Sequence, residues 1–257
     1  MKKVLVVFGE GSKKNVLIDS AIFFKEKFGY EIVPLYVKDV RRDEIIPATM
    51  DGMIVNLSNN SFSQERDAFE EEEVKHLQEK LKLRGINSVL NVEFGFPWDI
   101  IKEYMKLADL LIFEKGEALS ESAVTVLKNH FKPIVMVGEK AITSLEKVGI
   151  SSDDGVKINK SVFSFINIFP DIKEFIMLTL LYKIEDNTLL KYLKEKEKVV
   201  EWKNFDGETA KEEYLNEVNN LDLLIMGNLS RGYFFEKITG KKGLNIMEKS
   251  QTSIFIG

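Results

Sequence analysis

The chain has 257 residues, a formal net charge of −5 and no cysteine; 44% of its residues are hydrophobic and 30% are charged. This composition is typical of a folded globular protein and excludes an intrinsically disordered one. The negative charge disfavours nucleic acid and anionic membranes as partners. Without cysteine there is no disulfide, no thiolate metal site and no cysteine nucleophile.

Membrane and metal functions are also disfavoured by the sequence. No apolar run approaches the roughly 20 residues that a membrane span needs, and the run after the basic start MKK is too short for a signal peptide. Only two histidines occur, His76 and His130, and both are expected on helices with one exposed face. A histidine metal site or a Ser-His-Asp triad is therefore disfavoured. We expect a cytoplasmic protein that binds no nucleic acid, no membrane and no metal.

In the first half of the chain, predicted strands and helices alternate. Apolar runs predict strands at residues 3–8, 31–37, 87–93, 109–113 and 133–137. Helical periodicity predicts a helix that ends at Gly29, helices over 65–84 and 119–130, and a helix that begins near Pro97. Residues 39–64 lack periodicity and are expected to form a long loop. The acidic run Glu70–Glu73 is expected to be an exposed helix face.

The second half repeats this plan. Strands are predicted at 147–151, within 173–184, and at 199–204, 221–226 and 252–256, with helices between them. The segments DLLIF from Asp109 and DLLIM from Asp222 indicate an internal duplication. Alternating strands and helices with strands that are apolar throughout predict an α/β fold with parallel sheets. We expect two tandem domains, residues 1–140 and 141–257.

The closing stretch, Leu221–Gly257, has the order strand, glycine loop, helix, strand. In this arrangement backbone N–H groups and a helix N-terminus can hold a phosphate at the carboxyl end of a sheet. Glycines permit close backbone approach, while serine, arginine and lysine offer phosphate contacts. The candidate binding residues of this stretch are Gly227, Asn228, Ser230, Arg231, Gly232, Gly240, Lys241 and Lys242.

Two other phosphate-binding motifs are not supported by the sequence. A P-loop would need glycine at position 235 and serine or threonine at position 242, where this chain has Phe235 and Lys242. No G-x-G-x-x-G follows either first strand, which disfavours a dinucleotide-binding Rossmann domain.

The order of elements and the motifs resemble a tandem universal stress protein over essentially the whole chain. The resemblance implies Rossmann-like domains of the adenine nucleotide α-hydrolase type, each a five-stranded parallel sheet between helices. It also implies an adenine nucleotide near the first and fourth strands and a regulatory role in stress response. Because members are often dimeric, it implies a homo-oligomer or an intramolecular pseudo-dimer.

The ATP-binding members carry the loop G-x2-G-x9-G-[ST] after the fourth strand. In the second half its positions correspond to Gly227, Ser230, Gly240 and Lys241, so the spacing is met while serine replaces one glycine and lysine replaces the hydroxyl residue. Asp154 and Gly155 match the turn after the first strand, where the resemblance implies that the aspartate hydrogen-bonds the adenosine moiety.

The first half departs further from the motif. Glu10-Gly11-Ser12 and Gly95-Phe96-Pro97 match two turns of the resemblance, but Glu114 and Glu117 stand at the first two glycine positions. Two carboxylates would repel a phosphate, so we expect no ATP in this half.

The sequence therefore favours a regulatory protein, not an enzyme, with no catalytic residues and one ATP, ADP or AMP site in the second half. An interaction or scaffold protein that binds no nucleotide is the first alternative. A slow nucleotide hydrolase or transferase that uses a strand-end carboxylate and a metal is the second, although no spacing of metal ligands supports it.

Overall fold

A computed structural model describes residues 2–9, 11–42, 60–116, 119–153, 155–181, 188–228 and 248–257. Most of the predicted 39–64 loop, from 43 to 59, lies outside the described residues, as do Glu10, Glu117 and Asp154. Residues 60–64, which were assigned to that loop, are instead the start of a helix.

The first half contains five strands and their connecting helices. In chain order the elements are β1 (Lys3–Phe8), α1 (Lys14–Phe28), β2 (Glu31–Asp39), the short 3-10 helix η1 (Val40–Arg42), α2 (Asn60–Leu83), β3 (Asn91–Gly95), α3 (Pro97–Met105), β4 (Leu110–Glu114), α4 (Glu121–Asn129) and β5 (Ile134–Val137).

The second half follows the same order of strands and helices. Its described elements are β6 (Val148–Ser151), α5 (Val156–Ile168), β7 (Glu174–Leu180), α6 (Thr188–Glu195), β8 (Val199–Phe205), α7 (Ala210–Asn219), β9 (Leu223–Ile225) and β10 (Ser253–Ile256). Residues 229–247, which include the glycine loop of the closing stretch and most of the helix predicted after it, lie outside the described residues.

The described strands form one ten-stranded sheet with the order β3-β2-β1-β4-β5-β10-β9-β6-β7-β8. Neighbouring strands are parallel except at the centre, where β5 and β10 are antiparallel. Each half alone has the strand order 3-2-1-4-5, counted from its own first strand. The α/β architecture predicted from the alternating pattern is thus confirmed, and the two five-stranded parallel sheets are joined edge to edge. The predicted domain boundary after residue 140 falls between β5 and β6 and stays a prediction.

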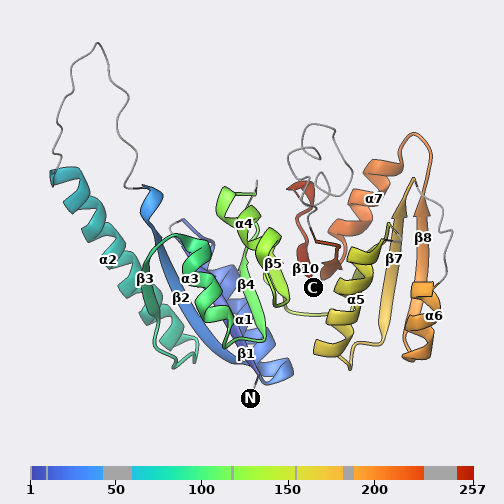
Figure 1. Cartoon of the computed structure of the whole chain (residues 1–257), viewed down its shortest axis with the longest axis horizontal. Coiled ribbons are helices and arrows are strands. Elements are labelled where there is room, and N and C mark those ends of the chain that lie inside the picture. Colours follow the sequence, from blue (N-terminus) through green and yellow to red (C-terminus); the bar gives the residue numbers. More distant parts are fainter. Residues whose placement is uncertain are drawn as a thin grey trace, which may run out of the picture.

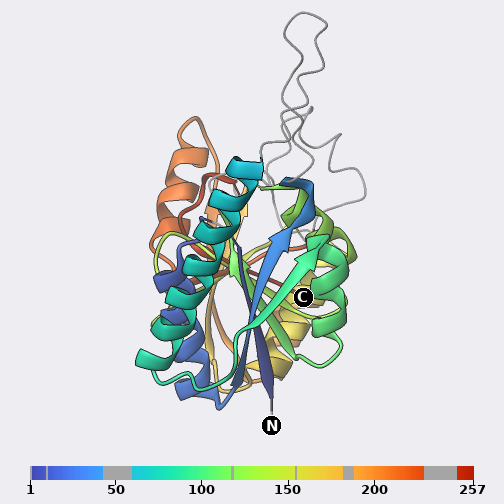
Figure 2. The ribbon, with the colours of Figure 1, turned by 90° about the vertical axis from the view of Figure 1, so that its left-hand side faces the viewer.

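Helices cover both faces of the sheet (Figures 1 and 2). One face packs against α1, α2, α5 and α6, which bury residues such as Phe24, Leu81 and Phe165. The other face packs against α3, α4 and α7, which bury Met105 and Leu127 among others. Alternate residues of one strand therefore enter different cores, because successive side chains of a strand point to opposite faces. This explains why the strands are apolar throughout rather than alternating.

Local signals in the sequence set several helix ends. Gly29 follows α1 in the left-handed conformation, with φ of 70°, and its N–H bonds back to the last turn of the helix. Pro97 occupies the first turn of α3, where its missing N–H costs nothing. The Ser120 hydroxyl caps α4 by accepting a hydrogen bond from the N–H of Ala123 at 3.1 Å.

Candidate functional site

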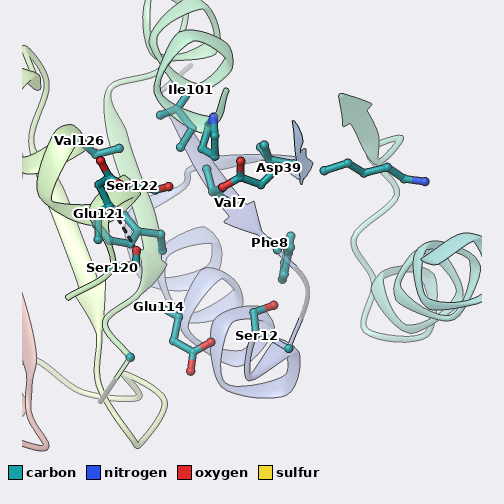
Figure 3. Close-up of a pocket in the computed structure, with 18 of the residues that line it drawn as sticks. Val7, Phe8, Ser12, Asp39, Ile101, Glu114, Ser120, Glu121, Ser122 and Val126 are labelled. Carbon is teal, nitrogen blue, oxygen red and sulfur yellow. Dashed lines mark hydrogen bonds between the residues drawn. The ribbon is translucent and has the colours of Figure 1, made fainter. Parts of the chain in front are cut away.

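A cavity of about 590 Å³ lies in the first half, at the carboxyl ends of β1, β2 and β4. The strand order reverses between β1 and β4, and open α/β sheets bind ligands outside the carboxyl ends of their strands at such a point. The cavity is lined by both polar and apolar side chains, the apolar ones being Val7, Phe8, Val37, Pro97, Ile101, Phe113, Ala123 and Val126. Figure 3 shows the cavity and the polar side chains around it.

Arg41 and Asp39 form a bidentate ion pair on the rim of the cavity. The Nε of Arg41 donates to Oδ1 of Asp39 at 2.9 Å, and Nη2 donates to Oδ2 at 2.5 Å. Arg41 also reaches α4, where it donates to the Ser122 hydroxyl and lies 3.4 Å from Glu121. The hydrogen bonds from Arg41 hold the pKa of Asp39 below its ordinary value. The guanidinium is thus already neutralised by the chain itself.

Glu114 lies at the N-terminus of α1. Its Oε2 accepts a hydrogen bond from the main-chain N–H of Lys13 at 2.7 Å. A carboxylate at this position interacts favourably with the positive end of the helix dipole. Glu114 therefore places a carboxylate of the chain at the helix N-terminus, where a bound anion would be stabilised.

Two glutamates of α2 point inward and are paired. Glu70 lies 3.2 Å from the ammonium of Lys38, and Glu73 pairs with Lys14 and accepts a hydrogen bond from the Tyr36 hydroxyl. Although burial opposes it, hydrogen bonds from Lys14 and Tyr36 hold the pKa of Glu73 below its ordinary value. The prediction that the acidic run is an exposed helix face was wrong for these two residues. They are three positions apart on α2, so they share the helix face that lies toward the sheet.

In the second half, the structure describes three of the predicted site residues. Gly155 is the residue before α5, and its N–H donates to Oδ1 of Asp153 at 3.0 Å. Gly227 follows β9 and lies against the first turn of α5: a Cβ added there would be 3.1 Å from the Ile158 nitrogen and from Cβ of Lys157. The chain thus brings the end of β9 to the N-terminus of α5. The other candidates, Asp154, Ser230, Arg231, Gly232, Gly240, Lys241 and Lys242, lie outside the described residues.

The third residue, Asn228, lies beside His130 of the first half. Nδ1 of His130 is 2.8 Å from the Lys132 carbonyl, and the ring is buried with Asn228 beside it. Burial lowers the pKa of His130, and the positive charge of Lys160 lowers it further. The expectation of a half-exposed helix position holds for His76 but was wrong for His130, which follows α4 and is buried.

Sequence reasoning did not identify the rim of the first cavity. Asp39 and Arg41 were assigned to an irregular segment, and nothing in their spacing marks an ion pair. The Ser120 cap was detectable, since serine just before apolar residues at helical spacing marks the start of a helix. Within the described ranges, no group of three or more histidine, cysteine or acidic side chains could hold a metal ion. No described helix is long and apolar enough to cross a membrane.

Neither a family model nor a curated protein matches the sequence. Solved structures do match the fold. The crystal structure of a universal stress protein from Archaeoglobus fulgidus DSM 4304 has a TM-score of 0.70 and 14% identity, covering 98% of this chain and 94% of that one. This chain has the universal stress protein fold.

A second structure, of a candidate universal stress protein from Pseudomonas aeruginosa UCBPP-PA14, has a TM-score of 0.53 and 10% identity over 99% of this chain and 92% of that one. A functionally unknown protein from Pseudomonas aeruginosa PAO1 matches equally well. The universal stress protein fold, which the order of elements predicted, is confirmed by these matches.

Proposed function

We propose that the chain is a cytoplasmic regulatory protein, not an enzyme, that binds one adenine nucleotide at the carboxyl edge of its second half. The observation that carries this proposal is the contact between Gly227 and the first turn of α5. A glycine at the end of the fourth strand and an open helix N-terminus beside it are the parts that hold a phosphate in α/β proteins.

Two lysines favour an anion at this point, against one described carboxylate. The first turn of α5 has no acidic residue and no side-chain cap, but Asp153 accepts the N–H of Gly155 just before the helix and opposes an anion. Lys157 and Lys160 are exposed on the same helix. The helix N-terminus and the two lysines therefore both attract an anion. The matching position in the first half is Glu114, whose carboxylate opposes a phosphate.

Nucleotide binding would regulate by stabilising one state. A ligand that binds only the folded or closed form stabilises that form, and its population rises with the ligand concentration. The central β5–β10 pair joins the two halves in one sheet, so a change at the second-half site can reach the first half through main-chain contacts.

Isothermal titration with ATP, ADP and AMP tests the proposal. We expect one nucleotide per chain, and we expect Lys157→Glu to weaken ATP binding about tenfold or more, since a charged hydrogen bond contributes roughly 1.5–3 kcal/mol. Lys75→Glu, an exposed lysine of α2 in the other half, is the matched control and should bind like the wild type. Gly227→Glu copies the first-half residue and should abolish binding.

The alternative is an interaction protein of the same fold that binds no nucleotide. Absence of heat with millimolar ATP, together with no adenine nucleotide released on denaturing the purified protein, would favour it. Binding that survives both Lys157→Glu and Gly227→Glu would place the nucleotide elsewhere. Phosphate release from ATP and Mg²⁺ above the buffer rate would instead favour the slow hydrolase.

A further inference from the structure

The cations that line the first-half cavity are all engaged by the chain. Lys38 pairs with Glu70 at 3.2 Å, and Arg41 forms its two hydrogen bonds with Asp39. The ammonium of Lys115 reaches the other half of the sheet, where it donates to main-chain carbonyls of Ser250 and Glu248. None of these three cations is therefore offered to an incoming anion without breaking a contact.

Acceptors, by contrast, face the cavity. One oxygen of Glu114 accepts the Lys13 N–H, which leaves the carboxylate's remaining lone pairs available for donors. Ser12 lies at the same end of the cavity (Figure 3), and its buried hydroxyl has no hydrogen-bond partner in the part of the chain that the structure describes. Buried polar groups are almost always hydrogen-bonded, so an orphaned hydroxyl beside a cavity calls for a ligand or ordered water.

Part of the remaining cavity wall is apolar. Phe8, Ile101 and Val126 line it and are almost fully buried themselves. Above Gly9 and Gly11, an added Cβ would meet no described atom within 4 Å, so the backbone beside Ser12 is open. An apolar body placed here would bring a polar end group next to Glu114 and Ser12.

We propose that this cavity binds a small organic cation, an apolar body carrying a protonated amine, with the amine on Glu114 and Ser12. A carboxylate at the mouth of an apolar pocket attracts a cation and repels an anion. The site thus differs in charge preference from the nucleotide site proposed for the second half, and its existence does not depend on that proposal.

Three indoles with the same two-carbon arm test the charge preference: tryptamine, a cation, tryptophol, which is neutral, and indole-3-propionate, an anion. We expect titration calorimetry to show a Kd for tryptamine at least about tenfold lower than that for tryptophol, and no binding of indole-3-propionate. Equal affinity for all three, tighter binding of the anion, or no binding of tryptamine at millimolar concentration would overturn the proposal.

Two variants assign the charge preference to Glu114. Glu114→Gln keeps an oxygen for the Lys13 N–H, so it should fold normally and lose the preference for tryptamine over tryptophol. Glu114→Lys should shift the preference toward indole-3-propionate, a reversal that a merely structural role would not produce. Glu212→Gln, an exposed glutamate of α7, is the matched control. A preference for tryptamine that persists unchanged in Glu114→Gln would place the cation elsewhere and overturn the assignment.

Because ATP is titrated in the same variants, the two proposals can fail separately. Glu114→Gln should leave ATP binding unchanged, and Lys157→Glu should leave tryptamine binding unchanged.

Discussion

Lys115, the residue after β4, donates a hydrogen bond to the main-chain carbonyl of Ser250, 135 residues later in the chain and just before β10. A related contact occurs on the other half. Asn228, which follows β9, lies beside His130, which precedes β5. In each half, a residue shortly after the fourth strand thus contacts the segment just before the fifth strand of the other half. In each half, the segment after the fourth strand is therefore in contact with residues of the other half.

The buried ammonium of Lys115 gives the first prediction. Burial lowers the pKa of Lys115 to about 8, although Glu139 and Glu248 oppose the shift. In the unfolded chain the pKa of Lys115 is near 10.4. Above pH 8 the unfolded state therefore binds more protons than the folded state. The free energy of unfolding should therefore rise with pH in this window.

Urea denaturation at pH 7.5, 8.25 and 9 measures this slope. We expect Lys115→Met to remove its contribution, while the exposed lysine substitution Lys140→Met should keep the wild-type slope. The series stops at pH 9 because burial raises the pKa of Tyr30 and Tyr214 to about 12. In more alkaline solution these tyrosines lose their protons more readily in the unfolded state, so the free energy of unfolding would fall with pH. An unchanged slope in Lys115→Met would contradict the prediction.

His130 gives a prediction of the same sign at lower pH. Burial lowers the pKa of its ring below the ordinary value of about 6.5. Below pH 6.5 the unfolded state therefore takes up a proton that the folded state does not, and the free energy of unfolding falls as the pH decreases. Between pH 7.5 and 5.5, His130→Phe should show a flatter dependence than the wild type, whatever its absolute stability.

His76 provides the control for this comparison, since its side chain is 65% exposed on α2. His76→Phe should retain the pH dependence of the wild type. If both variants follow the wild-type curve, another group is responsible.

Two neighbouring glutamates of α2 should differ strongly when neutralised. Glu73 is paired with Lys14 and Tyr36, whereas the side chain of Glu72 is 67% exposed. We expect Glu73→Gln to lower the free energy of unfolding by about 1–3 kcal/mol, because it weakens charged hydrogen bonds that are partly buried. Glu72→Gln should stay within about 0.5 kcal/mol of the wild type. Equal effects in urea denaturation would mean that the inward pairing contributes nothing.

The fold could be predicted from the sequence because its main signals are local. Runs such as VLVVF in β1 and LLIF in β4 are strands buried on both faces, and Gly29 and Pro97 mark helix ends. The repeated DLLI segments indicated the duplication, and the glycine spacing supported the family resemblance. Each of these signals lies within a few residues of the element that it determines.

The site was less predictable, because its contacts join residues far apart in the chain. The Lys14–Glu73 pair joins α1 to α2 across 59 residues, and Arg41 contacts Ser122 across 81 residues. No local pattern marks such a pair. Glu114 was the exception: the repeat placed a carboxylate where the second half has Gly227, and the structure sets this carboxylate at the N-terminus of α1. The residues of the glycine loop stay predictions.

The central strand pair gives the last prediction. Gly138 follows β5 and lies against the start of β10, where an added Cβ would be 2.1 Å from the carbonyl oxygen of Gln251 and 2.9 Å from the carbonyl carbon of Thr252. Both atoms belong to the main chain, so they cannot move aside by a rotamer change. Gly138→Ala should therefore lower the free energy of unfolding by about 1–3 kcal/mol.

Gly9→Ala is the matched control, because its Cβ would meet no described atom within 4 Å, and its stability should lie within about 1 kcal/mol of the wild type. The two variants also test whether the halves unfold together. With one continuous sheet, the wild type and Gly9→Ala should unfold in a single urea transition monitored by Trp98 and Trp202, which lie in different halves. Gly138→Ala strains the only described strand pair that joins the halves, so its transition should shift to lower urea or split in two. An unshifted single transition in Gly138→Ala would mean that the β5–β10 junction does not hold the halves together.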